Sequence, residues 1–317
     1  MSQSLAFVFP GQGSQSIGML ADLASEHQLI VDTFSEASDA LGYDLWQLVS
    51  QGSESDLNRT DITQPAILAA SIALWRLWCA QSNLRPAWVA GHSLGEYSAL
   101  VAAGVLEFAD AVKLVRRRGE LMQQAVPQGE GGMAAILGLE DQQIIDLCAS
   151  AAAGQVVSAV NFNAPGQVVI AGHAAAVERA IEACKQAGAK RALPLPVSVP
   201  SHCALMRPAA EQLAEDFAAI QWREPQCTLV QNVTARPAAS LAELRDNLVQ
   251  QLFSPVRWVE TIEYLAAQGV ADLVECGPGK VLAGLNKRCA KALNNHVLET
   301  PAGFAAAREQ LEQGDKA

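Results

Sequence analysis

Residues 86–97, which read PAWVAGHSLGEY, constrain the fold of this chain more than any other stretch. The proline and the apolar residues after it predict a short buried strand, and a helix closed by Gly104 follows. A serine between Gly91 and Gly95 at such a junction matches the strained turn that presents a nucleophilic hydroxyl at the end of a sheet. The helix N-terminus directs free N–H groups to the same place. We therefore predict Ser93 as a nucleophile; the alternative is a tight turn whose serine only caps the helix.

Length and composition limit the class of protein. The chain has 317 residues, enough for about two domains, and 50% of them are hydrophobic while 17% are charged. These proportions are typical of a compact globular protein. The formal net charge of -11 argues against general affinity for nucleic acid or for an anionic membrane. We therefore expect no nucleic-acid partner and no membrane partner.

The cysteines indicate the cellular compartment. There are 7, scattered and without a Cys-x-x-Cys pair, which predicts neither a disulfide framework nor a metal site. They fit reduced thiols in a cytoplasmic protein. The N-terminus lacks a basic lead-in, and no stretch reads as long enough to span a bilayer. The prediction is a cytoplasmic protein that binds no metal.

The order of the predicted elements divides the chain into two domains. A long helix begins at 63–65, with Pro65 in its first turn, and leads to the strand before Ser93. From residue 130 the pattern becomes β-α-β-β-α-β, which is the ferredoxin-like arrangement. The predicted strands of this part are 132–138, 156–160, 167–171 and 192–199, and the predicted helices are 141–149 and 174–187.

We accordingly assign residues 130–198 to a small inserted α+β domain of ferredoxin-like type. We predict that residues 1–129 and 199–317 form a discontinuous catalytic domain of the α/β class, with a parallel sheet.

A serine nucleophile needs a base, and the chain has 5 histidines. His202 stands in a Pro-Ser-His loop at the start of a predicted helix, and loops held by a rigid scaffold often present functional side chains. His92 is next to the serine, but its side chain is expected to leave the turn in another direction. We predict His202 as the base and His92 as the next candidate. The alternative for His202 is a histidine that contacts only solvent.

Two further observations concern charge. No aspartate or glutamate in the second half stands out as the acid of a hydrolase triad, so a backbone carbonyl is the expected partner of the histidine. This predicts a gentler base, suited to acyl exchange. Arg116, Arg117 and Arg118 are consecutive in a predicted helix and point about 100° apart, so one of them can turn inward. The alternative is a solvated charged face.

Several motifs occur in order over nearly the whole chain. They are FPGQGSQ at 9–15, GHSLGEY at 91–97, the Arg118-Gly119 step, NFNAPGQ at 161–167, PSH at 200–202 and ECGPG at 275–279. Together they resemble the malonyl-CoA:acyl carrier protein transacylases of bacterial fatty acid synthesis. The resemblance implies a large α/β-hydrolase-like domain with a ferredoxin-like insert. It also implies transfer of a malonyl group from malonyl-CoA to the phosphopantetheine thiol of holo acyl carrier protein, with no cofactor.

The resemblance implies a role for each matching residue. Ser93 is expected to carry the malonyl group as an ester in a ping-pong reaction, and His202 to serve as its base. The backbone N–H groups of Gln12 and Leu94 are expected to form the oxyanion hole.

Four other residues are expected around this centre. Arg118 is expected to pair with the free carboxylate of malonate, and the backbone carbonyl of Gln251 to orient the histidine. Gln64 and Asn163 are expected to line the acyl or pantetheine channel. The protein is expected to be a monomer.

Other functions remain open from the sequence. A serine esterase or thioesterase resolves its acyl-enzyme with water, needs a triad acid and has no use for Arg118. A non-enzymatic subunit of a synthase complex keeps the fold for docking alone. A transacylase of polyketide synthesis or malonate decarboxylation shares the same motifs. Ser201 is not the bulky residue seen before the histidine in malonyl-selective polyketide modules, but stand-alone bacterial members resemble this sequence there, which favours malonyl.

Overall fold

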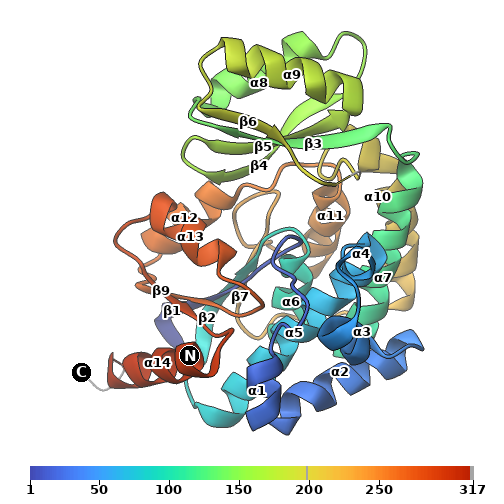
Figure 1. Ribbon diagram of the computed structural model, residues 1–317. Coiled ribbons are helices and arrows are strands. Elements are labelled where there is room, and N and C mark those ends of the chain that lie inside the picture. Colours follow the sequence, from blue (N-terminus) through green and yellow to red (C-terminus); the bar gives the residue numbers. More distant parts are fainter. Residues whose placement is uncertain (198, 315–317) are drawn as a thin grey trace.

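The computed structural model describes residues 1–197 and 199–314, and it contains two sheets (Figure 1). The larger sheet is parallel throughout, in the order β7-β2-β1-β8-β9. Its strands are β1 (Ser2–Phe9), β2 (Pro86–Gly91), β7 (Thr228–Val230), β8 (Asp272–Glu275) and β9 (Asn294–Val297). The parallel sheet that was expected for the catalytic domain is therefore present.

Strand β1 lies at the centre of the larger sheet and divides its core in two. Leu5, Phe7 and Phe9 point into one hydrophobic cluster, whereas Ala6 and Val8 point into another. Side chains of a strand alternate between the two faces, so a continuous apolar run is what a strand covered on both sides requires. The first cluster contains helices α2 (Gln28–Leu41), α5 (Thr60–Gln81), α6 (Gly95–Ala102), α7 (Phe108–Ala125), α10 (Arg207–Asp216), α11 (Leu241–Gln251) and α14 (Pro301–Gly314). The second contains α12 (Trp258–Ala267) and α13 (Val281–Cys289).

The remaining helices of the larger unit are short. They are α1 (Ala21–Glu26), α3 (Leu45–Gln51), α4 (Glu54–Leu57) and the 3₁₀ turns Ala204–Met206 and Phe217–Ala219.

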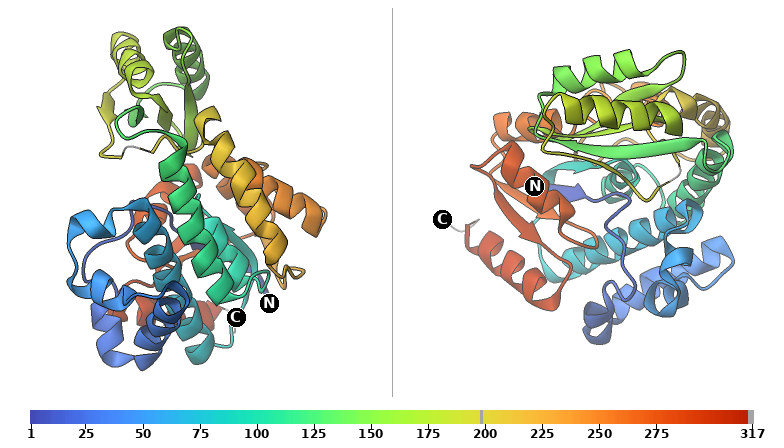
Figure 2. Two further views of the ribbon diagram at one scale, coloured as in Figure 1. Left: turned by 90° about the vertical axis from the view of Figure 1, so that its right-hand side faces the viewer. Right: turned by 45° about the horizontal axis from the view of Figure 1, so that its top comes forward.

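The smaller sheet is antiparallel, with the order β4-β5-β3-β6. Its elements are β3 (Gly131–Leu137), α8 (Asp141–Ala151), β4 (Val157–Ala164), β5 (Gln167–His173), α9 (Ala174–Gln186) and β6 (Arg191–Pro194). Helices α8 and α9 cover its outer face (Figure 2) and enclose a separate hydrophobic cluster. The β-α-β-β-α-β order confirms the predicted class, a large α/β unit with a small α+β unit.

The inner face of the smaller sheet looks toward the larger unit. Met133 and Val160 form a cluster there with Cys203, which follows the predicted base. Strand β4 also bonds directly to the larger unit, because Phe162 N–H donates to Val256 O at 3.0 Å and Val256 N–H donates to Val160 O at 2.8 Å. The two sheets therefore meet around the segment that carries His202.

The predicted bounds of α5, β4 and β6 were wrong. Helix α5 begins at Thr60, so Pro65 lies in its second turn and not its first. Its first turn forms without proline, because the Arg59 carbonyl accepts the Thr63 N–H at 2.7 Å. Strand β4 continues to Ala164, so the asparagine-rich segment is part of a strand, and β6 is shorter than predicted. Prediction missed the extension of β4 because asparagines are poor strand formers and one of the partners of the strand, Val256, is distant in sequence.

Helix α5 also bears on the expectation that no stretch could span a bilayer. It is long and apolar enough to do so by length and composition, but 83% of its most apolar window is buried inside the protein. It packs against α2 and α7, so it is a core helix of the larger unit.

Candidate active site

The serine lies on a sharp turn between β2 and α6. Its φ is 54°, in the left-handed region that non-glycine residues rarely adopt. The flanking glycines make this turn possible. A Cβ on Gly91 would lie 1.9 Å from the Gly95 carbonyl carbon, and a Cβ on Gly95 would lie 2.0 Å from the Phe9 carbonyl oxygen. The turn is thus pressed against β1, and the serine hydroxyl projects from the end of the sheet.

His202 reaches the serine from a segment 109 residues away. Its Nε2 lies 2.7 Å from Ser93 Oγ, and its Nδ1 lies 2.7 Å from the backbone oxygen of Gln251. A carbonyl only accepts, so Nδ1 carries the proton and the Nε2 lone pair faces the hydroxyl. The structure therefore brings together the three residues predicted as nucleophile, base and orienting carbonyl.

The surroundings of His202 keep its ring neutral. Burial and the positive charge of Arg118 lower the pKa of His202 to about 3, although its hydrogen bond to Gln251 opposes this shift. A neutral imidazole is ready to accept the serine proton at any physiological pH. The imidazolium formed in this way is a strong acid, so it returns the proton readily to a leaving group.

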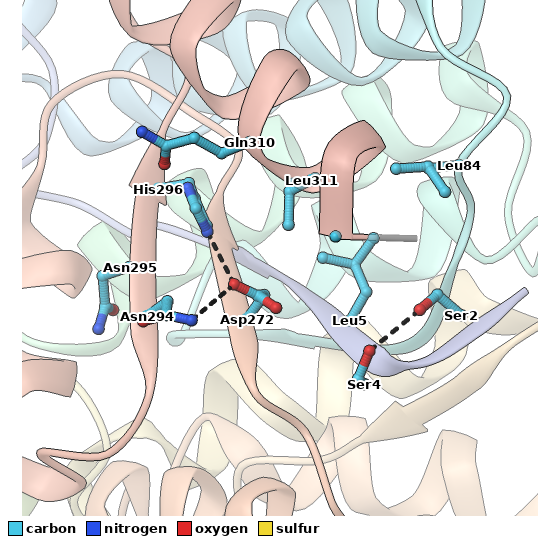
Figure 3. Close-up of a pocket in the computed structure, with 11 residues that line it drawn as sticks. Ser2, Ser4, Leu5, Leu84, Asp272, Asn294, Asn295, His296, Gln310 and Leu311 are labelled. Carbon is cyan, nitrogen blue, oxygen red and sulfur yellow. Dashed lines mark hydrogen bonds and ion pairs between the residues drawn. The ribbon is translucent and has the colours of Figure 1, made fainter. Parts of the chain in front are cut away.

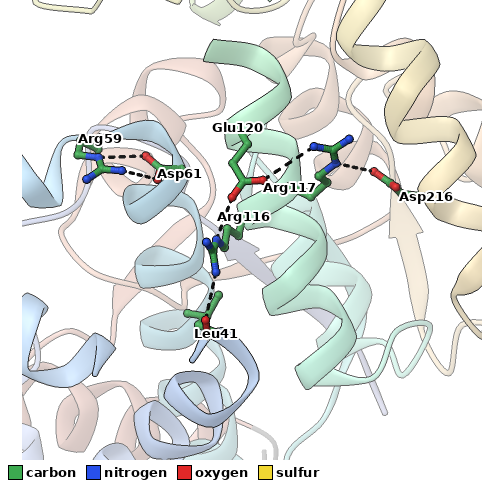
Figure 4. A network of polar contacts seen from close by, with 7 residues as sticks. All are labelled: Leu41, Arg59, Asp61, Arg116, Arg117, Glu120 and Asp216. Atoms are coloured by element: carbon green, nitrogen blue, oxygen red, sulfur yellow. Dashed lines mark hydrogen bonds and ion pairs between the residues drawn. The ribbon is translucent and has the colours of Figure 1, made fainter. Parts of the chain in front are cut away.

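The three consecutive arginines have different environments. Arg116 and Arg117 point outward into ion pairs, with Glu120 at 3.0 Å and with Asp216 at 3.2 Å respectively (Figure 4). Their side chains are 40% and 41% exposed, whereas Arg118 is 1% exposed. The helical rotation of about 100° per residue places only the third arginine toward the serine.

The Arg118 guanidinium is held by neutral groups. It donates from Nη1 to Gln64 Oε1 at 2.8 Å and from Nη2 to Gln251 Oε1 at 3.0 Å, and its Cζ lies 5.5 Å from the ring centre of Tyr97. Nη2 is also 3.4 Å from Ser93 Oγ. In the described ranges 1–197 and 199–314, Arg118 forms no ion pair. A buried cation that forms no direct ion pair and lies beside the nucleophile favours an anionic substrate.

A cavity of about 340 Å³ opens onto the serine, between the two units. Its lining includes Gln12, Arg59, His92, Ser93, Leu94, Arg118 and His202 from the larger unit, and Met133, Asn161, Leu195 and Val197 from the smaller. Gln12 and Leu94 line it beside the serine, and neither of their backbone N–H groups donates to an acceptor in the described part of the chain. Both N–H groups are thus available to an oxyanion.

Two predicted channel residues lie one layer behind this cavity. Gln64 is fully buried and supports Arg118, while Asn163 Oδ1 lies 2.7 Å from His92 Nε2. Neither belongs to the cavity lining. The extension of β4 explains the position of Asn163, because a strand residue can point inward to the His92 ring, which also packs on Trp258 with 5.5 Å between ring centres.

Another hollow, of about 530 Å³, lies at the opposite edge of the parallel sheet, where its strands begin (Figure 3). His296 there faces Asp272 at 3.0 Å, and Ser2 Oγ and Ser4 Oγ lie 3.2 Å from each other. Since its histidine faces a carboxylate and not a hydroxyl, this hollow lacks the serine–histidine geometry. No group of three potential metal ligands occurs within the described residues.

Sequence reasoning missed the polar groups beneath the serine. Glu96 is 1% exposed and accepts hydrogen bonds from Gln231, Asn232 and Gln251. Asn232 Oδ1 in turn accepts the Ser93 N–H at 2.7 Å. A signal existed for both: Glu96 is a lone charge in an apolar helix, and Asn232 follows a strand at the carboxyl end of the parallel sheet, where ligands bind.

The parallel α/β scaffold, the strained serine and its buried histidine are those of an acyl-transfer enzyme. A family model described as "Acyl transferase domain" matches residues 6–303. The chain belongs to the malonyl CoA-acyl carrier protein transacylase family. It is 60% identical over 305 residues to the protein of that name from Salmonella typhimurium, covering 96% of this chain and 99% of the relative.

Solved structures agree with this assignment. An acyl carrier protein S-malonyltransferase from Vibrio cholerae is 57% identical, with a TM-score of 0.94 over 96% of this chain and 99% of that one. A malonyl-transacylase solved in complex with a type II PKS acyl-carrier protein is 55% identical, with a TM-score of 0.96 over 97% of this chain and 99% of that one.

Proposed function

We propose that this protein transfers a malonyl group from malonyl-CoA to the phosphopantetheine thiol of holo acyl carrier protein, through a malonyl ester on Ser93. One observation carries the proposal. Ser93 Oγ lies 2.7 Å from a neutral imidazole nitrogen and 3.4 Å from an arginine that forms no ion pair with any described residue. The site thus offers a nucleophile, a base and a receptor for a carboxylate within one cavity.

The first half-reaction begins when His202 Nε2 accepts the proton of the Ser93 hydroxyl. The serine oxygen attacks the thioester carbonyl, and the resulting oxyanion receives the N–H groups of Gln12 and Leu94. The CoA thiolate leaves and takes the proton from His202. The pantetheine thiol then gives its proton to His202 and attacks the ester, which restores the serine. One site serves two carriers in turn, so the kinetics are ping-pong.

Substrate choice is assigned to Arg118. A guanidinium offers two parallel N–H donors, which match a carboxylate. Gln64 and Gln251 hold it near Ser93 Oγ at the distances given above. The malonyl carboxylate is close to the ester carbon, so it reaches the guanidinium while the group is on the serine.

The esterase reading is less well supported. Water-resolved hydrolases of this class have a carboxylate on the far nitrogen of the histidine, whereas here Nδ1 faces a backbone carbonyl. A buried arginine beside the nucleophile also has no function in the hydrolysis of a neutral ester.

Further proposals concern the compartment, the oligomeric state, the pathway and the domain boundaries. We place the protein in the cytoplasm, as a monomer, in fatty acid synthesis. We also propose the division into 1–129 with 199–317 and 130–198; the separate hydrophobic cluster of the smaller unit supports it. Residue 198, at the second boundary, lies outside the described residues. The relative bound to a polyketide carrier makes such a carrier the alternative acceptor, and comparing acceptance of the two carriers tests it.

Intact-mass spectrometry tests the mechanism. Malonyl-CoA alone is expected to add one malonyl mass to the protein. When holo acyl carrier protein is then added, this mass is expected to disappear from the protein and to appear on the carrier. The variant Ser93→Ala is expected to add none. Malonyl uptake by this variant, or release of free malonate in place of transfer, would overturn the proposal.

A further inference from the structure

We propose that Glu96 is a positioning residue for substrate choice. Its carboxylate holds the side-chain amide of Gln251 in the one orientation that presents an oxygen to Arg118. This inference rests on the proposed role of Arg118 in binding malonate.

The contacts of Glu96 are the starting point. The carboxylate is buried in the first turn of α6, and all its donors come from the second half of the chain. Oε1 accepts from Gln231 Nε2 at 3.1 Å, while Oε2 accepts from the backbone N–H of Asn232 at 3.1 Å and from Gln251 Nε2 at 2.9 Å. Glu96 therefore ties α6 to the segment after β7 and to the end of α11.

The Gln251 side chain connects this carboxylate to the substrate-binding arginine. Its Nε2 donates both to Glu96 and to the backbone oxygen of Ser93, each at 2.9 Å, and its Oε1 accepts from Arg118 Nη2 at 3.0 Å. A carboxylate and a carbonyl only accept, and a guanidinium only donates. A flipped amide would set oxygen against oxygen and N–H against N–H. Only the observed orientation satisfies all three partners, so Glu96 reinforces, together with the Ser93 carbonyl, the orientation in which the Gln251 oxygen meets Arg118.

The property of Glu96 that matters is its acceptor, not its charge. The Asn232 N–H belongs to the backbone and cannot reverse, so in Glu96→Gln the new amide oxygen is expected to stay at the Oε2 position and still accept from Gln251. The new NH₂ group then faces Gln231, whose amide can rotate together with that of Asn247, its partner at 2.8 Å, at the loss of its hydrogen bond to the Leu244 carbonyl. This rearrangement weakens the hydrogen bonds around Gln231 and leaves the contact between Gln251 and Arg118 in place. In Glu96→Met the Ser93 carbonyl is left as the acceptor for Gln251 Nε2, so the amide loses one of its two anchors.

The test is the ratio of malonyl to acetyl acylation of Ser93 in a single turnover, followed by rapid quench and mass spectrometry. Glu96→Met is expected to lower the ratio by about ten- to a hundred-fold, the range for a hydrogen bond to a charged group. Glu96→Gln is expected to stay within about three-fold of the wild type, because one acceptor is kept. Gln251→Met, which preserves the backbone carbonyl that holds His202, is expected to match Glu96→Met. The double variant is expected to add little, because both changes break one connection.

Controls separate this role from general damage. Glu275 is also a buried glutamate, 1% exposed, and it receives the N–H groups of Leu282 and Ala283 far from Arg118, so Glu275→Gln is expected to keep the ratio. An equal fall of malonyl and acetyl rates in Glu96→Met, or the same ratio change in Glu275→Gln, overturns the proposal. A loss in Glu96→Gln as large as in Glu96→Met overturns it too.

A second route covers a variant that does not fold. If Glu96→Met is unfolded by circular dichroism, Gln251→Met tests the same connection from its other end, and an unchanged ratio there contradicts the inference. Failure of the proposed function gives a different result. In that case Arg118→Ala itself leaves the malonyl-to-acetyl ratio unchanged, whatever the Glu96 variants do.

Discussion

Arg118 differs from Arg116 and Arg117 only in the direction that its helix gives it. We expect Arg118→Ala to raise the activation free energy of malonyl transfer by about 2–5 kcal/mol. This is the cost of leaving one member of a buried charge pair without its partner. The rate of acetyl transfer should stay the same or rise, because acetyl carries no charge that would be left without a partner. Arg118→Lys should recover little, since a point charge does not replace the guanidinium. Initial rates with both acyl-CoA donors measure this.

The neighbouring arginines are the matched controls for that series. Arg116→Ala and Arg117→Ala remove exposed ion pairs, which contribute about 0–1 kcal/mol, and both variants should keep the preference for malonyl. Equal behaviour of all three variants would mean that another group binds the malonate carboxylate.

His202 gives a prediction about pH. Its pKa is lowered to about 3 by burial and by Arg118, so the neutral base is present above that pH and is lost as the pH falls through it. The acylation half-reaction should therefore show no histidine inflection near the ordinary value of 6.5. Burial raises the pKa of Glu96 to about 7, so the profile is compared in the wild type and in Glu96→Gln. An inflection near 6.5 that persists in Glu96→Gln contradicts the assignment.

Removing the base should also have a large effect. His202→Ala should slow acyl transfer by at least ~10²-fold, the usual contribution of a general base. A few-fold loss would move the role to His92, whose Nε2 faces Asn163 in the structure.

Among single residues, the sequence predicted the reacting groups better than the residues that hold them in place. Ser93 and His202 are identifiable from a local turn and a loop, and the resemblance supplied Gln251 and Arg118. The contact of Asn232 with Ser93 was missed, because it spans 139 residues and depends on how β7 pairs with β2; only the position of Asn232 after a strand pointed to it. Long-range pairing leaves no local periodic signal.

At the scale of elements, the turn between β2 and α6 is the most tightly constrained feature. A Cβ on Gly95 meets backbone atoms of β1, which cannot move aside as a side chain can. We expect Gly95→Ala to destabilise the protein by at least ~1–3 kcal/mol, as over-packing does, and to displace Ser93. Thermal unfolding and acylation rate are the measurements.

Gly284 in α13 provides the comparison. Its Cβ position has no atom within 4 Å, so Gly284→Ala should stabilise the helix by roughly 0.5–1 kcal/mol. Similar melting temperatures for the two variants would show that the close approach at Gly95 relaxes without cost.

Element prediction succeeded where hydrophobic pattern and stop signals agreed, as in α9, which begins at the predicted residue 174 and ends one residue before the predicted 187. It failed where tertiary contacts override composition. Asn161 and Asn163 are poor strand formers, yet β4 includes both, because β5 on one side and Val256 on the other supply hydrogen-bond partners.

At the scale of the whole molecule, burial gives opposite pH dependence to two kinds of group. It raises the pKa of Glu96 and of Glu275 to about 7, and it lowers the pKa of His202 to about 3 and that of His92 below its ordinary value. Between the ordinary values of 4.5 for a glutamate and 6.5 for a histidine, the folded glutamates hold protons that the unfolded chain releases, so stability falls as pH rises. The histidines gain protons only on unfolding, so their contribution rises with pH.

The glutamates and the histidines therefore oppose each other between about pH 4.5 and 6.5, and Glu275→Gln should shift this balance. With one falling contribution removed, the free energy of unfolding should rise with pH in this window by up to about 1.4 kcal/mol per pH unit relative to the wild type. Urea unfolding at pH 5 and pH 6.5 measures the slope, separately from any uniform loss caused by the missing cap on α13. Glu178→Gln, on the exposed face of α9, removes a charge without removing a buried group. Its free energy of unfolding should therefore change with pH as that of the wild type does. If Glu275→Gln also runs parallel, Glu275 ionises in the folded protein as it does in the unfolded chain, and the balance has another origin.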